Sequence, residues 1–501
     1  MIPSQQEQTV FWKTLAEGLS AGQRLIDCLK KARSALPGGE FAAVVDSIIG
    51  AVNGGKTLSE ALAEHPDAFG KPIVDAMFAG EIGGVIDHAA SQVAAAVQAA
   101  DLGRLEATGA ISPQAIEYVS QLIAKAHEAR ASDIHIDQLE GGQALVRQRI
   151  DGVLHRVEPP PPELLPKVID YIKVMGAINV AERDMPQDGR CIGRDFDMRI
   201  STVPAAYGDR VFMRVISRDP ASVVLGLDDL GLSRDDLRKV RELCHIPSGL
   251  VIVNGPTGTG KTTLLYSMLM ELNKPEAAIL TIEDPVELTF AGIGHIQIRP
   301  QIGLTFAKAI RHVMRQAPNI IMIGEIRDLE IANLCAQCSL TGLLVLTTLH
   351  ADTSPGAIRR LLDMGMEPFL VASSLAGAIS LRLVRKLCQC SEPGKAPPAY
   401  ALPPGAAEYL ARYSDANLRQ PKGCDKCYGN GYLGRTAIYE VLHLGSRMRQ
   451  LAADNADLPT LQAAAIEGGM RTMLMDGMEK VAQGLTTVEE VLRVLPPGLG
   501  V

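Results

Sequence analysis

The segment GPTGTGKT, from Gly255 to Thr262, fits the phosphate-binding pattern GxxxxGK[ST]. An apolar run at 250–253 precedes it and a helix is predicted over 261–273, which is the context that the pattern requires. Glycines allow successive backbone N–H groups to point at one anion, and the helix N-terminus adds a partial positive charge. Lys261 would pair with the outer phosphates and Thr262 would ligate Mg²⁺. We therefore predict a nucleotide site lined by Gly255, Pro256, Thr257, Gly258, Thr259, Gly260, Lys261, Thr262 and Thr263, with a chance glycine-rich turn as the alternative.

Two carboxylates and one histidine follow other short apolar runs of the same region. Glu283 and Glu325 each end such a run or come just after one, and His350 follows a third. A carboxylate there can hold a metal's water or orient the attacking water. The residue pattern does not divide these roles, although we favour Glu325 for the metal and its water and Glu283 for water activation. His350 could reach a γ-phosphate, and an ordinary hydrogen-bonded histidine is the alternative.

The elements that must position these residues follow an alternating pattern. Strands are predicted at 250–253, 278–282, 320–323 and 343–348, and helices at 261–273, 305–316 and 329–340. Continuously apolar strands separated by helices indicate a parallel sheet that is covered on both faces. Ligands of such sheets bind beyond the carboxyl ends of the strands, where the residues above are placed.

Four of the nine cysteines form two close pairs near the C-terminal end, Cys388 with Cys390 and Cys424 with Cys427. Four thiolates suit tetrahedral Zn²⁺, in a structural role because no coordination position stays open. Four free thiols on a loop are the alternative. Cys335 and Cys338 lie inside the helix predicted at 329–340, and we interpret both as core packing.

Length and composition limit the classes of protein. The chain has 501 residues, more than one hydrophobic core of about 250–300 residues would hold, so several domains are expected. The net charge of −8 and the aromatic content of 4% disfavour nucleic acid as a partner. The N-terminus lacks the features of a secretory signal, and the least polar stretch, 368–381, is shorter than the about 20 residues of a membrane span. We expect an intracellular protein.

Residues 113–495 resemble the hexameric secretion ATPases of type II secretion and type IV pilus assembly. The motifs that carry the resemblance are SDIHID at 132–137, RQRIDG at 147–152, PQDGR at 186–190, the phosphate loop, TIEDPVE at 281–287, RQAPNIIMIGEIRD at 315–328, LTTLHAD at 346–352 and GLTTVEEVLRV at 484–494. The resemblance implies ATP and Mg²⁺ as cofactors, a homo-hexamer, and arginine fingers at Arg190 and Arg199, which a short hairpin separates here. It also places Arg311, Arg315 and Arg327 close to the nucleotide.

Residues 10–100 are predicted to be helical, and residues 8–100 resemble the cytoplasmic domain of the inner-membrane platform protein of the same machines. The resemblance is carried by FWKTLAEGLSAGQRL at 11–25, GGKTLSEALAEHPDAF at 54–69 and AGEIGGVIDHA at 79–89. It implies that this region docks the chain on the platform protein. A generic helical adaptor is the alternative.

Together these observations predict a multidomain α/β protein. Its parts are an all-α platform-like domain at 1–108, a PAS-like α+β domain at 109–225, a RecA-like P-loop NTPase core at 226–385, a tetracysteine metal-binding subdomain at 386–440 and a helical C-terminal region at 441–501. The function expected from the resemblance is a Mg-dependent ATPase that powers pilus or pseudopilus assembly at the cytoplasmic face of the inner membrane, with further components of the machine as partners. The alternatives are a pilus retraction motor, a nucleic-acid translocase and a nucleotide-binding adaptor without hydrolysis.

Overall fold

The computed structural model describes residues 3–82, 86–98, 112–192, 196–217, 225–395, 402, 406–412 and 417–495. The chain forms two compact units, a first unit of residues 1–219 and a second unit of residues 220–501. The domain boundary predicted at 108/109 lies outside the described residues.

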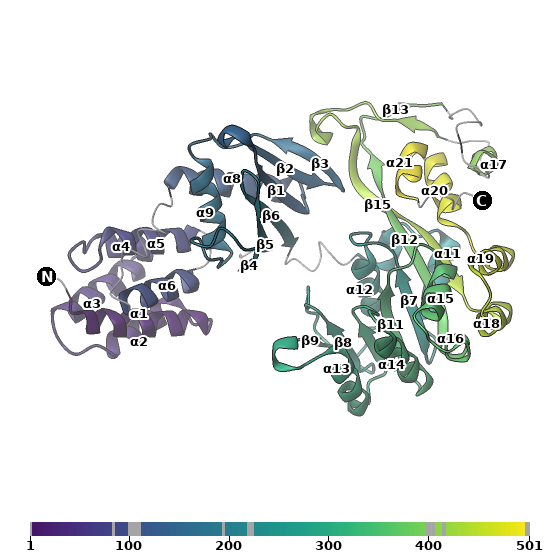
Figure 1. The fold of residues 1–501 in the computed structure, drawn as a ribbon, viewed down its shortest axis with the longest axis horizontal. Coiled ribbons are helices and arrows are strands. Elements are labelled where there is room, and N and C mark those ends of the chain that lie inside the picture. Colours follow the sequence, from purple (N-terminus) through teal and green to yellow (C-terminus); the bar gives the residue numbers. More distant parts are fainter. Residues whose placement is uncertain are drawn as a thin grey trace. The chain divides into compact units, whose positions relative to one another are not determined.

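The first unit begins with a helical bundle (Figure 1). Ser4 and Thr57 each cap a helix through a capping box. The side chain of the cap accepts from the backbone N–H of the acidic residue three positions later, whose carboxylate accepts from the backbone N–H of the cap. The bundle encloses its own apolar core, in which the rings of Phe11 and Trp12 meet edge to face at 5.1 Å. This confirms the helical prediction. The helices are α1 (Gln5–Ser20), α2 (Leu25–Ser34), α3 (Glu40–Asn53), α4 (Leu58–Ala63), α5 (Lys71–Ile82) and α6 (Ile86–Gln98).

The first unit continues with a six-stranded antiparallel sheet in the order β3-β2-β1-β6-β5-β4. Ile134 and Ile136 are buried in a core that includes the apolar residues of two helices, α8 (Pro113–Glu128) and α9 (Leu165–Met175). Alternation along a strand sends Asp133 and His135 to the opposite face. The strands are β1 (Asp133–Gln138), β2 (Ala144–Ile150), β3 (Val153–Val157), β4 (Gln187–Ile192), β5 (Phe196–Ala205) and β6 (Gly208–Ser217).

The second unit is built on a seven-stranded sheet in the order β15-β12-β7-β11-β10-β8-β9 (Figure 1). Every neighbouring pair is parallel except β12 with β15. The four predicted strands are confirmed, whereas the sequence did not predict the other three. The strands are β7 (Gly249–Asn254), β8 (Ile279–Glu283), β9 (Ile293–Gln297), β10 (Ile320–Ile323), β11 (Leu344–Leu349), β12 (Leu375–Leu387) and β15 (Tyr432–His443).

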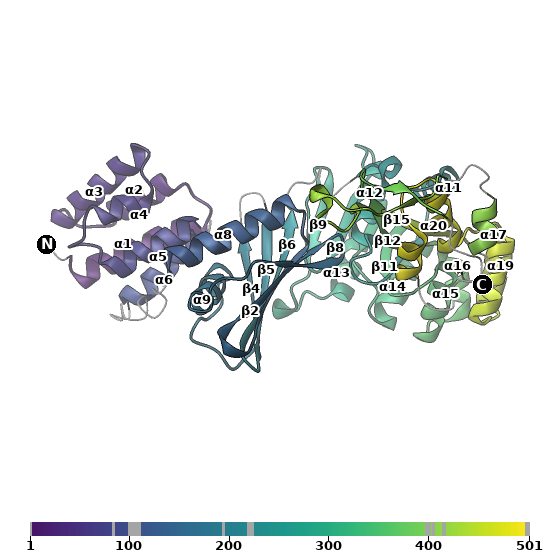
Figure 2. The same cartoon turned by 90° about the horizontal axis from the view of Figure 1, so that it is seen from above.

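Helices cover both faces of this sheet, as the apolar strands predict (Figure 2). Val251 and Val253 pack in one core with α11 (Arg234–Cys244) and α12 (Lys261–Leu272), and Leu250 and Ile252 pack in the other. Cys335 and Cys338 are fully buried in that second core, which confirms their interpretation as packing residues. The helices of the second core are α13 (Phe306–Val313), α14 (Leu329–Leu340), α15 (Ser354–Asp363), α16 (Pro368–Ser374), α18 (Ser446–Ala453) and α19 (Leu458–Glu467).

The C-terminal part departs from the predicted division. The boundaries predicted at 385/386 and 440/441 fall inside β12 and β15, because both strands belong to the seven-stranded sheet of the second unit. The apolar stretch at 368–381 forms α16 and the start of β12. No helix among the described residues is both long and apolar enough to cross a membrane. The tail contains α20 (Met473–Ala482) and α21 (Val488–Val494), as predicted.

Candidate functional site

The predicted phosphate loop joins β7 to α12. Gly255 has a φ of 147°, and a Cβ there would lie 2.6 Å from Thr259 Oγ1 and 2.9 Å from the Leu381 carbonyl oxygen, so a side chain does not fit. Gly258 has a φ of 78°, and a Cβ at that position would meet no atom within 4 Å. Lys261 Nζ donates to the carbonyl oxygens of Gly255 (2.7 Å) and Pro256 (2.9 Å), and burial lowers the pKa of its ammonium group. The loop is thus closed on itself by the lysine that would bind phosphate.

The other predicted site residues meet the loop at one edge of the sheet. Strands β7, β11, β10 and β8 are consecutive and parallel. Their carboxyl ends lead to Gly255, His350, Glu325 and Glu283, respectively. The sheet order therefore brings together residues that are up to about a hundred positions apart in the sequence.

Glu325 is partly exposed, with 28% of its side chain accessible. It forms an ion pair with Arg327, and His350 Nε2 lies 3.6 Å from its Oε2. Arg327 also reaches Asp284 at 3.3 Å and stands over the ring of Phe306 at 5.4 Å. Glu325, His350 and Arg327 thus form one polar group beside the phosphate loop.

Glu283 is buried, with 4% of the residue accessible. Its Oε2 accepts from Tyr266 Oη at 2.5 Å, and its Oε1 accepts from Thr281 Oγ1 at 2.6 Å. His295 Nδ1 lies 3.1 Å from the same Oε1. Sequence reasoning missed Tyr266 and His295, because α12 and the unpredicted β9 bring them to Glu283 only in the folded chain.

Arg382 is a further cation that the sequence analysis missed. Only 4% of it is accessible, and a Cβ on Gly255 would lie 3.3 Å from its Nη1. Its Nη2 donates to Asp352 at 2.8 Å, and burial lowers the pKa of its guanidinium group. An arginine inside the apolar stretch of β12 was the signal that could have indicated it.

The predicted arginine fingers lie in the first unit. In the register of the sheet, Arg190 on β4 lies opposite Arg199 on β5, and Arg199 lies opposite Arg214 on β6. Arg190 also forms an ion pair with Asp197 at 2.5 Å. The turn of the hairpin between them, at 193–195, lies outside the described residues, and the action of both arginines on a nucleotide stays a prediction.

The four paired cysteines converge. Their Sγ atoms all lie within 4.8 Å of one another, and Cys388–Cys424, Cys390–Cys427 and Cys424–Cys427 are separated by 3.9, 3.8 and 3.7 Å. A tetrahedron with Zn–S bonds of about 2.3 Å has edges of about 3.8 Å, so the arrangement fits zinc. Burial raises the pKa of the Cys427 thiol, but N–H donors from Cys424 and Gly431 outweigh it and bring this pKa to about 7. The thiolate form of Cys427 is thereby favoured, whereas burial raises the pKa of the Cys390 thiol to about 12.

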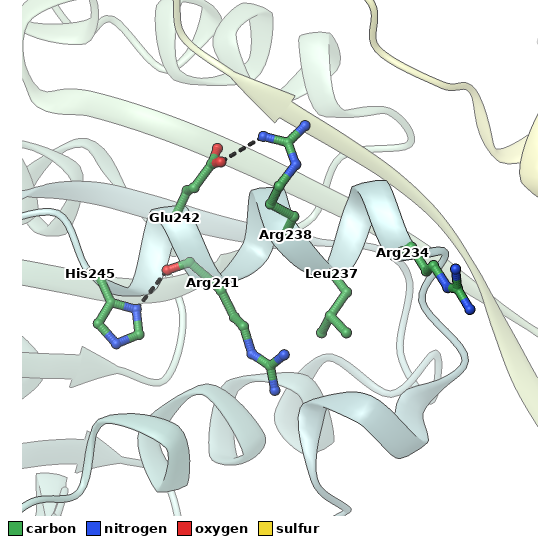
Figure 3. Close-up of a pocket in the computed structure, with 6 residues that line it drawn as sticks. All are labelled: Arg234, Leu237, Arg238, Arg241, Glu242 and His245. Atoms are coloured by element: carbon green, nitrogen blue, oxygen red, sulfur yellow. Dashed lines mark hydrogen bonds and ion pairs between the residues drawn. The ribbon is translucent and has the colours of Figure 1, made fainter.

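A pocket on α11 lies apart from these residues (Figure 3). Arg238 pairs with Glu242 at 2.7 Å, and Arg241 pairs with Asp228 and Glu271 at 2.6 and 3.0 Å. Its basic side chains are largely neutralised by neighbouring carboxylates, so we assign no ligand to it.

Comparison with known proteins assigns the chain to a family. Residues 111–493 match the family model of the type II/IV secretion system proteins. The chain belongs to this family. Residues 11–123 match the model of protein F of the type II secretion system, in agreement with the resemblance of the N-terminal region to a platform protein.

Similar proteins of the family include proteins of a type II secretion system and of a type IV pilus. Type II secretion system protein E of Xanthomonas campestris pv. campestris is 45% identical over 391 residues, which cover 76% of this chain and 67% of that protein. The type IV pilus assembly ATPase PilB of Myxococcus xanthus is 41% identical over 388 residues, or 75% and 67% of the two chains.

Solved structures agree at the level of the fold. The pilus retraction motor PilT with bound ADP is 26% identical with a TM-score of 0.50, over 76% of this chain and 98% of PilT. The Legionella pneumophila ATPase DotB is 20% identical with a TM-score of 0.56, over 75% of this chain and 94% of DotB.

Proposed function

We propose that this chain is an ATPase motor that hydrolyses Mg-ATP to power the assembly of type IV pilus or type II secretion pseudopilus subunits. The observation that carries the proposal is the convergence of Lys261, Glu325, Glu283 and His350 on one edge of a parallel sheet, in a chain of the type II/IV secretion system family. Phosphoryl transfer depends mainly on positioning and on charge stabilisation, which such an edge can supply.

Each residue of the site has a proposed role. Lys261 leaves the loop carbonyls to pair with the outer phosphates, and the Thr262 hydroxyl holds Mg²⁺, which supplies charge neutralisation when bound. Glu325 organises the metal's water, and Glu283 orients the attacking water. His350, which lies beside Glu325, contacts the γ-phosphate of the bound nucleotide. Arg327 would leave Glu325 for the nucleotide.

The motor is proposed to act as a homo-hexamer, in which Arg190 and Arg199 neutralise transition-state charge. The match of residues 11–123 to protein F supports docking on the inner-membrane platform protein. We therefore place the motor at the cytoplasmic face of the inner membrane. Zinc at the four cysteines would be structural, since the four sulfurs fill its coordination positions.

The alternative functions are less well supported. A retraction motor is represented by PilT at 26% identity, against 41–45% for the secretion and assembly proteins. A nucleic-acid translocase is disfavoured by the net charge of −8.

Phosphate release from the purified chain tests the proposal, with the assembly state measured by light scattering. We expect release by the wild type with Mg²⁺, loss of release with EDTA, and a loss of at least about a hundredfold in Glu325→Gln. Lys274→Ala, an exposed lysine beyond the end of α12, is the matched control and should behave as wild type. Absence of phosphate release in every assembly state would contradict hydrolysis. Equal, near-zero rates in the wild type and Glu325→Gln would instead favour the adaptor.

A further inference from the structure

The carboxylate of Glu283 is held by three side chains from three different elements. Tyr266 belongs to α12, the helix that the phosphate loop opens, and Thr281 belongs to β8 itself. His295 belongs to β9, where it is the register partner of Thr281. Its side chain is 6% accessible, as is that of Glu283. The nucleotide helix and the edge strand of the sheet therefore meet on this one carboxylate.

The protonation of His295 follows from its hydrogen bonds. The backbone N–H of Phe290 donates to His295 Nε2 at 3.1 Å, so Nε2 is an acceptor without a proton. The ring proton is then on Nδ1, which lies 2.9 Å from Thr281 Oγ1 and 3.1 Å from Glu283 Oε1. The single Nδ1 proton is therefore directed at Thr281 Oγ1 and Glu283 Oε1, and the backbone N–H of Phe290 fixes this tautomer.

Aromatic packing fixes the orientation of the ring as well. The ring of Phe290 packs tilted against His295, with centroids 5.9 Å apart, and edge to face against Tyr266 at 5.2 Å. Tyr266 is fully buried, and burial raises the pKa of its hydroxyl, which therefore remains a donor.

The number of donors has a consequence for chemistry. Two carboxylate oxygens offer about four acceptor positions; Tyr266 and Thr281 take two of them, and the single Nδ1 proton of His295, which Thr281 Oγ1 shares, points at a third. About one position is left, and the surrounding donors fix its direction. A carboxylate with one directed lone pair is suited to orient a single water for attack.

We propose that His295 is a positioning residue for ATP hydrolysis, which aims the remaining acceptor position of Glu283 at the attacking water. This inference rests on the proposed function. Small misplacements of a catalytic group cost rate, so loss of the imidazole donor should lower kcat and leave ATP binding at Lys261 largely intact.

Two substitutions of His295 test the proposal in the full-length chain, with kcat and KM for ATP as readouts. His295→Leu removes the hydrogen bonds of the ring to Phe290, Thr281 and Glu283, and we expect kcat to fall by about tenfold to a hundredfold with KM within about twofold. His295→Gln can accept from the Phe290 N–H and donate toward Glu283, and should recover most of the loss. His245→Leu is the control, because His245 is exposed and, within the described part of the chain, its ring is hydrogen-bonded to the Arg241 carbonyl oxygen alone. A wild-type kcat in His295→Leu, or an equal loss in His295→Gln, would overturn the proposal.

Two further variants separate positioning from a purely structural role. In a Glu283→Gln background, His295→Leu should cause no additional loss of kcat, and an additive loss would overturn the proposal. Tyr266→Phe removes one donor to Glu283 without a change of shape. Tyr266→Phe should also lower kcat and leave KM for ATP unchanged. It replaces His295→Leu as the test if that variant does not fold. A wild-type kcat in Tyr266→Phe overturns the proposal. Phosphate release by the wild type tests the proposed function separately, and a wild type without release overturns both.

Discussion

Glu283 and Glu325 end neighbouring strands, yet their surroundings differ. Glu325 is partly exposed between Arg327 and His350, where a metal-bound water could reach it. Glu283 is buried and takes donors from uncharged groups. The residue pattern did not divide their roles, whereas these contacts support the assignment of the metal's water to Glu325 and of a single aimed water to Glu283.

A third carboxylate provides a pH-dependent prediction. Burial raises the pKa of Glu440 to about 7, although the backbone N–H groups of Ser354 and Met473 and the charge of Arg382 oppose the shift. The folded chain thus binds this proton more tightly than the unfolded chain. The stability that Glu440 contributes is complete below about pH 4.5 and is lost as the pH rises through about 7.

Urea unfolding of the wild type and Glu440→Gln between pH 5 and pH 8 tests this expectation. The free energy of unfolding of the wild type, relative to that of the variant, should fall by on the order of 2 kcal/mol over this range. Glu467→Gln, at an exposed position of α19, should leave the wild-type pH profile unchanged. Parallel profiles for the wild type and Glu440→Gln would show that Glu440 does not titrate there.

At the scale of elements, the cysteine cluster lies between β12 and β15 in the chain, because Cys388 follows β12 and Cys427 precedes β15.

We expect the purified wild type to contain one zinc per chain and Cys390→Ser to lose it. The loss should lower the free energy of unfolding by about 3 kcal/mol or more, since the metal binds only the folded cluster. Elemental analysis and denaturant unfolding measure both effects. Cys338→Ala, in the core of α14, should keep its zinc, and a zinc-free wild type would contradict the assignment.

Local patterns explain which elements the sequence predicted. The phosphate loop, the strands beside it and the residues after them are specified by short motifs and by apolar runs. Strands β9, β12 and β15 were missed because glycine and polar or charged residues, such as Arg382 and Glu440, interrupt their apolar runs, unlike those of the four predicted strands. His295 escaped notice because its contact with Glu283 arises only from the pairing of β9 with β8.

At the scale of the whole molecule, hydrolysis should depend on both units. Arg190→Ala/Arg199→Ala should lower kcat by about 10³-fold and change ATP affinity little, because the phosphate loop belongs to the second unit. Single-turnover phosphate release and nucleotide titration measure the two quantities. Arg156→Ala, an exposed arginine on β3, is the control. Unchanged hydrolysis in the double variant would exclude these residues as arginine fingers.

The helical bundle can be removed as a piece, because α1–α6 bury their apolar side chains in a core of their own. Deletion of residues 1–105 should abolish co-purification with the platform protein and leave phosphate release nearly unchanged. Retained association would contradict the docking role of the bundle.

Strand β12 runs from the phosphate loop toward the cysteine cluster. At Ser380, β12 pairs with Asn254, just before the phosphate loop, and eight residues later the chain reaches Cys388. At about 3.3 Å per residue, roughly 26 Å separates these points, mostly along one continuous strand. Arg385 on the way bonds Glu490 of α21 at 2.8 Å. The candidate nucleotide site and the cysteine cluster thus lie at the two ends of one stretch of backbone, which the sheet and α21 both hold in place.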